Sequence, residues 1–207
     1  MGWKILFTIF FVTLGPIKLI VPFAALTQGA DWALRREIAL RSFGISLLTA
    51  FGMFFFGKFF LENFRVGLDT VRLTAGLILF LGSLEILRRP AVPGKVAESP
   101  VPPSKSVAMI PMTFPNILTP IGVAAIVLLS YLAADQGGDA TFQVLAMLVI
   151  VMGLNLVAMF GSSRILRWMG GTAVLQILGG VLAVLQAVLG MQVIVNGLRG
   201  LGVILGG

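Results

Sequence analysis

A small set of polar side chains stands inside stretches of this sequence that are otherwise apolar. Lys18 follows Pro16 in LGPIKLIVPF, and Thr113, Asn116 and Thr119 lie among prolines in IPMTFPNILTP. A proline inside a helix removes a backbone donor and frees the carbonyl four residues earlier. These stretches therefore offer backbone groups as well as side chains to a polar ligand. Such groups bind a small solute or an ion by hydrogen bonds and dipoles, without covalent chemistry.

The residue types that most catalytic chemistry requires are missing. The chain has no cysteine and no histidine, which excludes disulfides, thiol chemistry and histidine general bases. An intramembrane enzyme would need a nucleophile with a base, or a cluster of carboxylates or metal ligands. Glu85 is the only carboxylate inside a predicted span. We therefore expect no enzyme, no metal site and no cofactor, with Na⁺ or H⁺ as the only candidate coupling ions.

The elements that position these residues are membrane spans. The 207 residues are 58% hydrophobic and 11% charged, with a mean hydropathy of +1.04, whereas soluble domains carry about 25% charged residues. An all-α integral membrane protein is predicted, with membrane lipid as its surroundings. Six apolar runs are near the ~20 residues that cross a hydrocarbon core. The expected spans are residues 4–27, 41–57, 72–88, 107–132, 142–162 and 173–198.

The basic residues are distributed unevenly between the two sides of these spans. The loops after the first, third and fifth spans hold nine of them: Arg35, Arg36, Arg41, Arg88, Arg89, Lys95, Lys105, Arg164 and Arg167. Cytoplasmic loops are enriched in Lys and Arg, so this side is predicted to be cytoplasmic and both termini to lie outside. The protein is expected in the cytoplasmic (inner) membrane of a prokaryote. The net charge of +7 is then a topology signal, and no nucleic-acid partner is expected.

The two halves of the chain align at one fixed offset of 104 residues. Residues 16–17 and 120–121 are both Pro-Ile, and residues 56–57 and 160–161 are both Phe-Gly. Because each half has three spans, the second half enters the membrane from the opposite side. This inverted-topology repeat is an organisation that many secondary transporters share. The predicted division is a first repeat over 1–88, a proline-rich cytoplasmic linker over 89–106 and a second repeat over 107–207.

The first and fourth spans are predicted to be discontinuous at their prolines. In inverted-repeat transporters, broken helices at equivalent positions frame the substrate near the middle of the membrane. Their N-terminal ends offer N–H groups to a carboxylate, and freed carbonyls accept from an ammonium or bind Na⁺. Simple kinks packed by neighbouring helices are the alternative. The candidate substrate-binding residues are Gly15, Pro16, Ile17, Lys18, Thr113, Asn116, Thr119, Pro120, Gly122 and Asn155.

Lys18 requires a partner or water, because an ammonium near the centre of a bilayer costs at least ~2.5–3.5 kcal/mol. It could pair with Glu85, stand in for a coupling cation, or reach the headgroups through its long stem. Glu85 could equally pair with Arg88 or Arg89, and it is also the candidate for proton coupling. Asn155 is explained slightly better by an interhelical hydrogen bond than by ligand binding. Packing or interface roles are also expected for Gln186, Gln192 and Asn196.

Four stretches of the sequence resemble the MarC/SnatA family of membrane proteins. LGPIKLIVPFAALTQG resembles its first proline motif and IPMTFPNILTPIGVAAIV its second, while VRLTAGLILFLGSLEIL is similar to its third helix and GMQVIVNGL to its C-terminal signature. The resemblance covers nearly the whole chain. It implies two inverted three-helix repeats and transport of small neutral amino acids such as alanine and glycine. Gly15, Lys18 and Thr119 differ from the residues usual in the family's motifs.

These observations together favour a secondary transporter. It would move a small neutral amino acid, or a similar small polar metabolite, across the cytoplasmic membrane by alternating access, with Na⁺ or H⁺ as the candidate coupling ion. An uncoupled channel or exporter-like pore with the same broken helices is the alternative. Glycines on the second and sixth spans suit close helix packing, within the chain or in a homo-oligomer.

Overall fold

The computed structural model describes residues 2–88, 102–168 and 172–203, and these residues form helices and turns without a strand. The predicted linker lies largely outside them. The helices are α1 (Trp3–Leu14), α2 (Ile17–Leu26), α3 (Trp32–Asn63), α4 (Leu68–Arg88), α5 (Pro120–Gln136), α6 (Gly138–Trp168) and α7 (Ala173–Gly200). Two short irregular helices, η1 (Lys105–Ala108) and η2 (Met109–Ile117), precede α5.

The predicted multi-span architecture is confirmed. Five candidate spans are long and apolar enough to cross a membrane, the first of which comprises α1 and α2 together. Residues 105–117 and 120–134 meet at a bend of 66° and make a sixth span if they are counted as one. The first and fourth spans are thus both interrupted, where the prolines predict it.

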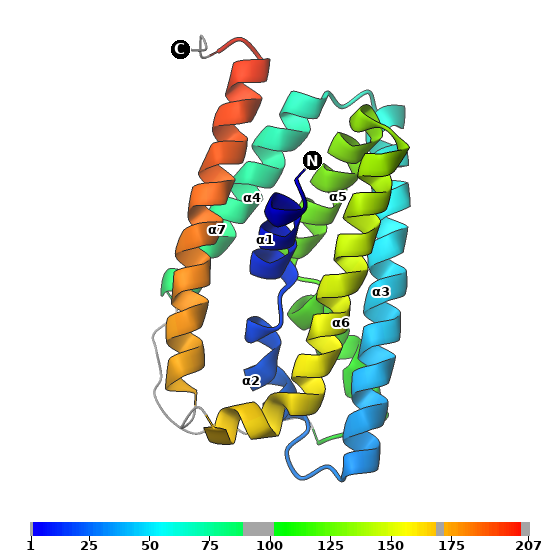
Figure 1. Ribbon diagram of the computed structural model, residues 1–207, viewed down its shortest axis with the longest axis vertical. Coiled ribbons are helices and arrows are strands. Elements are labelled where there is room, and N and C mark those ends of the chain that lie inside the picture. Colours follow the sequence, from blue (N-terminus) through cyan, green and yellow to red (C-terminus); the bar gives the residue numbers. More distant parts are fainter. Residues whose placement is uncertain (1, 89–101, 169–171, 204–207) are drawn as a thin grey trace.

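The helix bounds recur at the offset of 104 residues. Shifting α3 by 104 gives 136–167, against the observed Gly138–Trp168, and shifting α4 gives 172–192, against Ala173–Gly200. Figure 1 shows that α1 and α2 run down the molecule, α3 runs up and α4 runs down, whereas α5 runs up, α6 down and α7 up. Each element of the second half is therefore antiparallel to its counterpart, as the inverted repeat predicts.

Some of the helix contacts are also repeated between the two halves. Helix α2 packs against α6, and its counterpart α5 packs against α3. The pairs α3 with α6 and α4 with α7 join counterparts to each other. The exchange is incomplete, because α5 packs against α4 and α6 more extensively than its counterpart α2 packs against α7 and α3. Helices α4 and α7 approach closely at Gly76 and Gly190, where an added Cβ on Gly76 would lie 2.8 Å from the Gly190 carbonyl oxygen.

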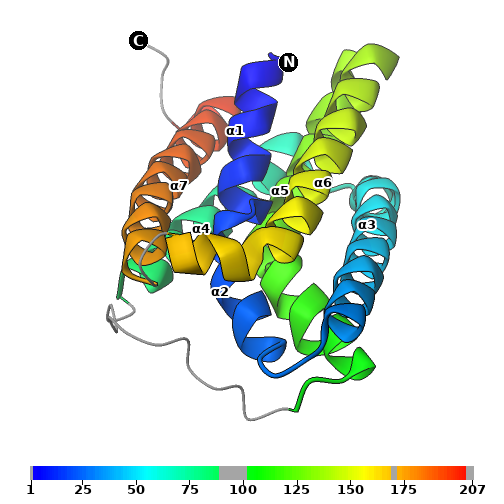
Figure 2. The ribbon, with the colours of Figure 1, turned by 60° about the horizontal axis from the view of Figure 1, so that its bottom comes forward.

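Helix α1 lies at the centre of the molecule, between α7 and α6 (Figures 1 and 2). Its inner face, formed by Leu6, Phe10 and Leu14, is fully buried. These side chains belong to a core that α3, α5 and α6 complete. A short N-terminal half-helix enclosed in this way ends in the protein interior, where its last carbonyls need protein partners because water and lipid are excluded.

The predicted start of the second span at residue 41 is wrong. Helix α3 begins at Trp32, because the Asp31 side chain accepts a hydrogen bond from the Leu34 N–H at 2.9 Å and caps the helix. The charged first turns remain helical, and Glu37 forms an i,i+4 ion pair with Arg41 at 2.8 Å. The hydropathy pattern marks the apolar part of this helix and misses its polar extension. The sixth span, by contrast, begins at the predicted residue.

Candidate functional site

The chain breaks at two equivalent places, which we call the first break (residues 14–16) and the second break (residues 118–120). Gly15 ends α1 with φ −69° and ψ 166°, and Thr119 precedes α5 with φ −69° and ψ 154°. Both residues precede a proline, which disfavours helical backbone and favours this extended conformation. The repeated pattern Leu-X-Pro-Ile thus produces the same local backbone twice.

The two breaks contact each other in the interior. Gly122, in the first turn after the second break, lies against the side chain of Leu14, which an added Cβ on Gly122 would overlap. Gly15 has no room for a side chain either, since a Cβ there would overlap the carbonyl oxygen of Phe11. The structure therefore brings together the predicted residues around the first break and Gly122 at one crossing point.

Asn155 on α6 forms a hydrogen bond to the C-terminal end of α1. Its side chain is 1% exposed, and its Nδ2 donates to the carbonyl oxygen of Leu14 at 2.8 Å. That carbonyl is one of the last of α1, which have no partner within the helix. The second atom of the amide, Oδ1, is buried and has no hydrogen-bond partner within the described part of the chain. The interhelical bond expected for Asn155 is present, and an unused acceptor remains beside it.

Lys18 extends the same polar cluster to α7. Its Nζ donates to Oε1 of Gln186 at 3.1 Å and lies 3.5 Å from the carbonyl oxygen of Thr13. Gln186 is fully buried, and its Nε2 donates to the carbonyl oxygen of Leu79 on α4 at 3.1 Å. Lys18 therefore links the first break to the packed pair of α4 and α7.

The partners of Lys18 are not those expected from the sequence. Its hydrogen bonds go to an amide and a carbonyl, while Glu85 lies on the exposed side of α4. The Lys18–Glu85 pair and the coupling role of Glu85 remain predictions. The sequence predicts a packing or interface role for Gln186, but it does not predict the hydrogen bond between Gln186 and Lys18. A glutamine in the middle of an apolar span was the available signal.

At the second break, the polar side chains serve the chain's own backbone. Thr119 Oγ1 accepts a hydrogen bond from the Gly122 N–H at 3.0 Å and caps α5. Thr113 Oγ1 donates to the Ala108 carbonyl oxygen at 2.7 Å and is buried against α3. Asn116 is half-buried. Thr113 therefore stabilises the irregular helix, where proline has removed regular backbone bonds, and Thr119 stabilises the start of α5.

The irregularity of η2 has a local cause in the sequence. Ile110 and Phe114 have extended backbone angles of φ −130° and −128° with ψ 124°, and each precedes a proline in cis. Residues before proline avoid the helical region. Neither side chain is buried, since Ile110 is 69% and Phe114 50% exposed. This segment differs in form from its counterpart α1, which is a regular helix.

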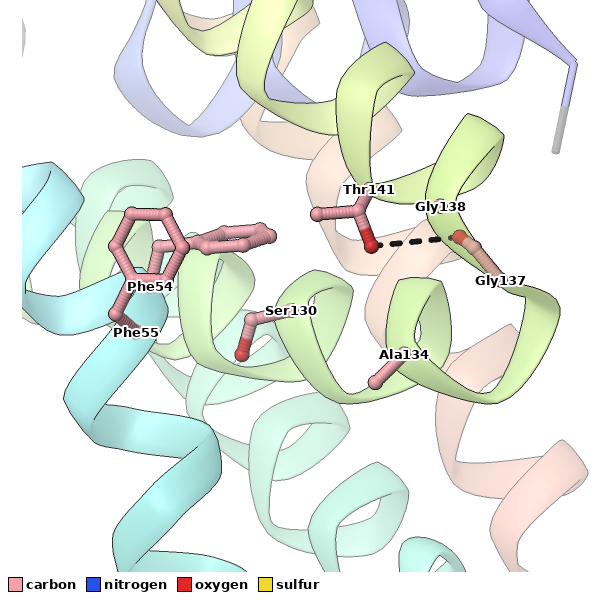
Figure 3. A pocket seen from close by; sticks show the side chains of 7 residues that line it. All are labelled: Phe54, Phe55, Ser130, Ala134, Gly137, Gly138 and Thr141. Carbon is pink, nitrogen blue, oxygen red and sulfur yellow. Dashed lines mark hydrogen bonds between the residues drawn. The ribbon is translucent and has the colours of Figure 1, made fainter.

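Two pockets of about 260 Å³ lie away from the first break. One is an apolar groove between α4 and α5, lined by the exposed Pro120, which therefore faces outward from the crossing point. The other, shown in Figure 3, is lined by Phe54, Phe55, Ser130, Ala134, Gly137, Gly138 and Thr141. Its hydroxyls donate to backbone carbonyls, Ser130 to Val127 at 2.8 Å and Thr141 to Gly137 at 3.4 Å.

Pro16 and Ile17, the remaining predicted residues, form the start of α2. Both are half-buried, and the Pro16 carbonyl accepts from the Leu19 N–H at 3.0 Å. Ile17 packs with Ile20 and Leu175 in a small apolar cluster between α2, α6 and α7. These residues hold α2 in place beside the break, and their side chains offer no polar group to a ligand.

Comparison with known proteins places this arrangement in a family. Residues 3–202 match the family described as MarC family integral membrane protein. The chain belongs to the MarC family. It is 28% identical over 170 residues to a UPF0056 membrane protein of Archaeoglobus fulgidus, covering 79% of this chain and 77% of the relative. It is also 28% identical over 150 residues to the UPF0056 inner membrane protein YhgN of Escherichia coli, covering 72% and 73%. No solved structure matches the chain.

Membership in the MarC family agrees with the resemblance found in the proline motifs. A UPF0056 membrane protein of Methanocaldococcus jannaschii is 23% identical over 183 residues, which cover 85% of this chain and 87% of the relative. The names of these relatives describe membrane proteins and state no substrate. Evidence for a substrate must therefore come from the geometry of the breaks.

Proposed function

We propose that this MarC-family protein is a secondary transporter for a small neutral amino acid, such as alanine or glycine, or a similar small polar metabolite. It works by alternating access in the cytoplasmic membrane of a prokaryote, with both termini outside and Na⁺ or H⁺ as the coupling ion. It carries out no catalytic chemistry and needs no cofactor. The protein moves its substrate past the crossing of the two breaks.

One observation carries this proposal. The half-buried Lys18 and the buried Asn155 and Gln186 lie around the interrupted first span, where two antiparallel halves of the chain contact each other. Polar groups inside a membrane protein are costly and mark substrate or ion pathways. Interrupted helices at equivalent positions of inverted repeats are where transporters bind their substrates. A protein with only a scaffolding role in the membrane would need neither feature.

Uptake by reconstituted liposomes tests the proposal. Labelled alanine, glycine and serine are offered with and without gradients of Na⁺ and of pH, and protein-free liposomes provide the background. We expect saturable uptake of at least one of them, increased by one of the two gradients. The absence of uptake under every condition would refute the substrate class.

The same assay distinguishes the alternative, an uncoupled channel or exporter-like pore. A pore gives solute flux that follows the solute gradient alone and is insensitive to both ion gradients. If the pH gradient drives uptake, Glu85→Gln is the variant to compare, because Glu85 is the candidate for proton coupling. Loss of the pH effect with retained exchange of alanine for alanine would assign the coupling role to Glu85.

A further inference from the structure

The unused oxygen of Asn155 is the feature of the first break that its structural role does not explain. A buried acceptor without a partner costs about 1–3 kcal/mol, and the rest of the cluster is hydrogen-bonded. Asn155 is 1% exposed, and its Oδ1 has no partner in the part of the chain that the structure describes. A hydrogen-bond donor that bound to this oxygen would remove the cost of leaving it without a partner.

The orientation of the Asn155 amide is fixed by its own contacts. Nδ2 lies 2.8 Å from the Leu14 carbonyl oxygen and 3.8 Å from Sδ of Met152, and both of these atoms are acceptors. Turning the amide over would set its oxygen against them, so the nitrogen must occupy this place. The oxygen therefore does not face these two acceptors. It lies within about 5 Å of the Leu14 carbonyl oxygen, because both amide atoms are bonded to the same carbon.

A cation lies at the same end of α1. Lys18 Nζ reaches the Thr13 carbonyl oxygen and Asn155 reaches that of Leu14, and these neighbouring residues have Cα atoms about 3.8 Å apart. Lys18 is a donor to anions, and Asn155 Oδ1 is an acceptor for N–H groups. The two therefore form complementary receptors at the end of one half-helix.

We propose that these two groups bind the two ends of an α-amino acid, with Asn155 Oδ1 accepting a hydrogen bond from the substrate ammonium and Lys18 holding the carboxylate. The assignment rests on the proposed transport of amino acids and specifies how the head group is recognised. It makes Asn155 the residue that selects for the amino group. The side chains about one turn from Asn155 on α6, Val151 and Ala158, are apolar and buried.

Ligand binding to the full-length chain in detergent tests this assignment, with alanine, lactate and propionate as probes. All three carry a carboxylate, but only alanine offers an ammonium and only lactate a hydroxyl at the same carbon. We expect affinities in the order alanine, lactate, propionate, with alanine at least about tenfold tighter than propionate, as a charge-assisted hydrogen bond implies.

Variants separate the two receptors. Asn155→Leu keeps the size of the side chain and removes the acceptor, so the preference for alanine over propionate falls to within about threefold. Lys18→Met keeps the stem and removes the charge, so alanine and propionate both weaken while their ratio is retained. Gln192→Leu is the matched control, since Gln192 is an exposed amide on α7 that bonds to Asn196 at 3.0 Å, and it leaves both affinities unchanged.

Each outcome decides one claim. If Asn155→Leu keeps the ratio while alanine is still transported, the assignment is overturned and the proposed function stands. If the wild type neither binds nor transports alanine, both fail. If Na⁺ alone stabilises the wild type but not Asn155→Leu, Oδ1 is a sodium ligand and the assignment is overturned. If Asn155→Leu does not fold, the wild-type series decides: equal affinities for alanine and propionate overturn it, and the expected order supports it.

Discussion

The two breaks have one backbone and two different sets of side chains. Both contain Leu-X-Pro-Ile with an extended residue before the proline, yet polar side chains from three helices gather only around the first. At the offset of 104 residues, Lys18, Asn155 and Gln186 correspond to Gly122, Phe51 and Gly82. The repeat therefore accounts for the shared backbone of the two breaks. Polar side chains surround the first break, whereas close packing surrounds the second.

The segments that flank the breaks differ as well. In the first half the additional proline, Pro22, lies after the break inside α2 and cannot donate to the Lys18 carbonyl. In the second half the additional prolines, Pro111 and Pro115, lie before the break and make η2 irregular. Freed backbone groups therefore occur on opposite sides of the two breaks. In the second half the Ala108 carbonyl oxygen accepts hydrogen bonds from Thr113 Oγ1 and from Ser42 Oγ on α3.

The largest expected effect comes from the two glycines. Gly15→Ala places a methyl group on the backbone carbonyl of Phe11, which cannot move without distorting α1, and we expect destabilisation of more than about 3 kcal/mol. Gly122→Ala meets the side chains of Leu14 and Thr119 and no backbone atom, so a smaller cost of about 1–2 kcal/mol is expected. Thermal unfolding in detergent measures both. Equal costs for the two substitutions would show that the breaks are equally constrained.

A smaller effect is expected at Gln186. Gln186→Leu removes an acceptor from Lys18 and a donor from the Leu79 carbonyl, and should cost about 1–2 kcal/mol. Combined with Lys18→Met, the cost should be smaller than the sum of the single changes by about 1 kcal/mol. The measurement is a double-mutant cycle from unfolding midpoints, with Gln192→Leu as the matched control. Strict additivity would mean that the bond between Lys18 and Gln186 contributes nothing.

The helix cap of the second break should have a moderate effect. Thr119→Ala removes the acceptor for the Gly122 N–H and is expected to destabilise the protein by about 1 kcal/mol. Thr119→Ser keeps the hydroxyl and should retain most of the stability. The first break has no such cap, since its equivalent residue is Gly15. If the serine variant is as unstable as the alanine variant, the hydroxyl is not what stabilises α5.

The smallest effect is expected at Asn116. Asn116→Ala should change the free energy of unfolding by less than about 0.5 kcal/mol and leave the preference for alanine over propionate intact, because the proposed head-group receptors lie at the first break. Ligand titrations of this variant beside Asn155→Leu make the comparison direct. A lost preference in Asn116→Ala would extend the site to the second break.

Sequence patterns predicted the frame well and the cluster only in part. Lys18 and Asn155 stand out because polar residues are rare inside apolar spans, and the prolines located both breaks. The partner of Lys18 was not predictable, since Gln186 lies 168 residues away and meets it through the packing of α2 with α7. Substrate binding by Thr113 and Thr119 remains a prediction, while their hydroxyls also hydrogen-bond to the Ala108 carbonyl oxygen and the Gly122 N–H. Sequence shows that a group is polar and not whether the backbone already uses it.

Hydropathy, chain length and proline geometry are local properties of the chain. The sequence alone therefore predicts the spans, their order, the inverted repeat and the two breaks. The tertiary structure decided which polar groups meet. Asn155 reaches the end of α1 only because α6 packs against it, and the Leu14 carbonyl uses one end of its amide while the other remains open. The asymmetry of the breaks therefore belongs to the fold, since it depends on side chains brought together from distant helices.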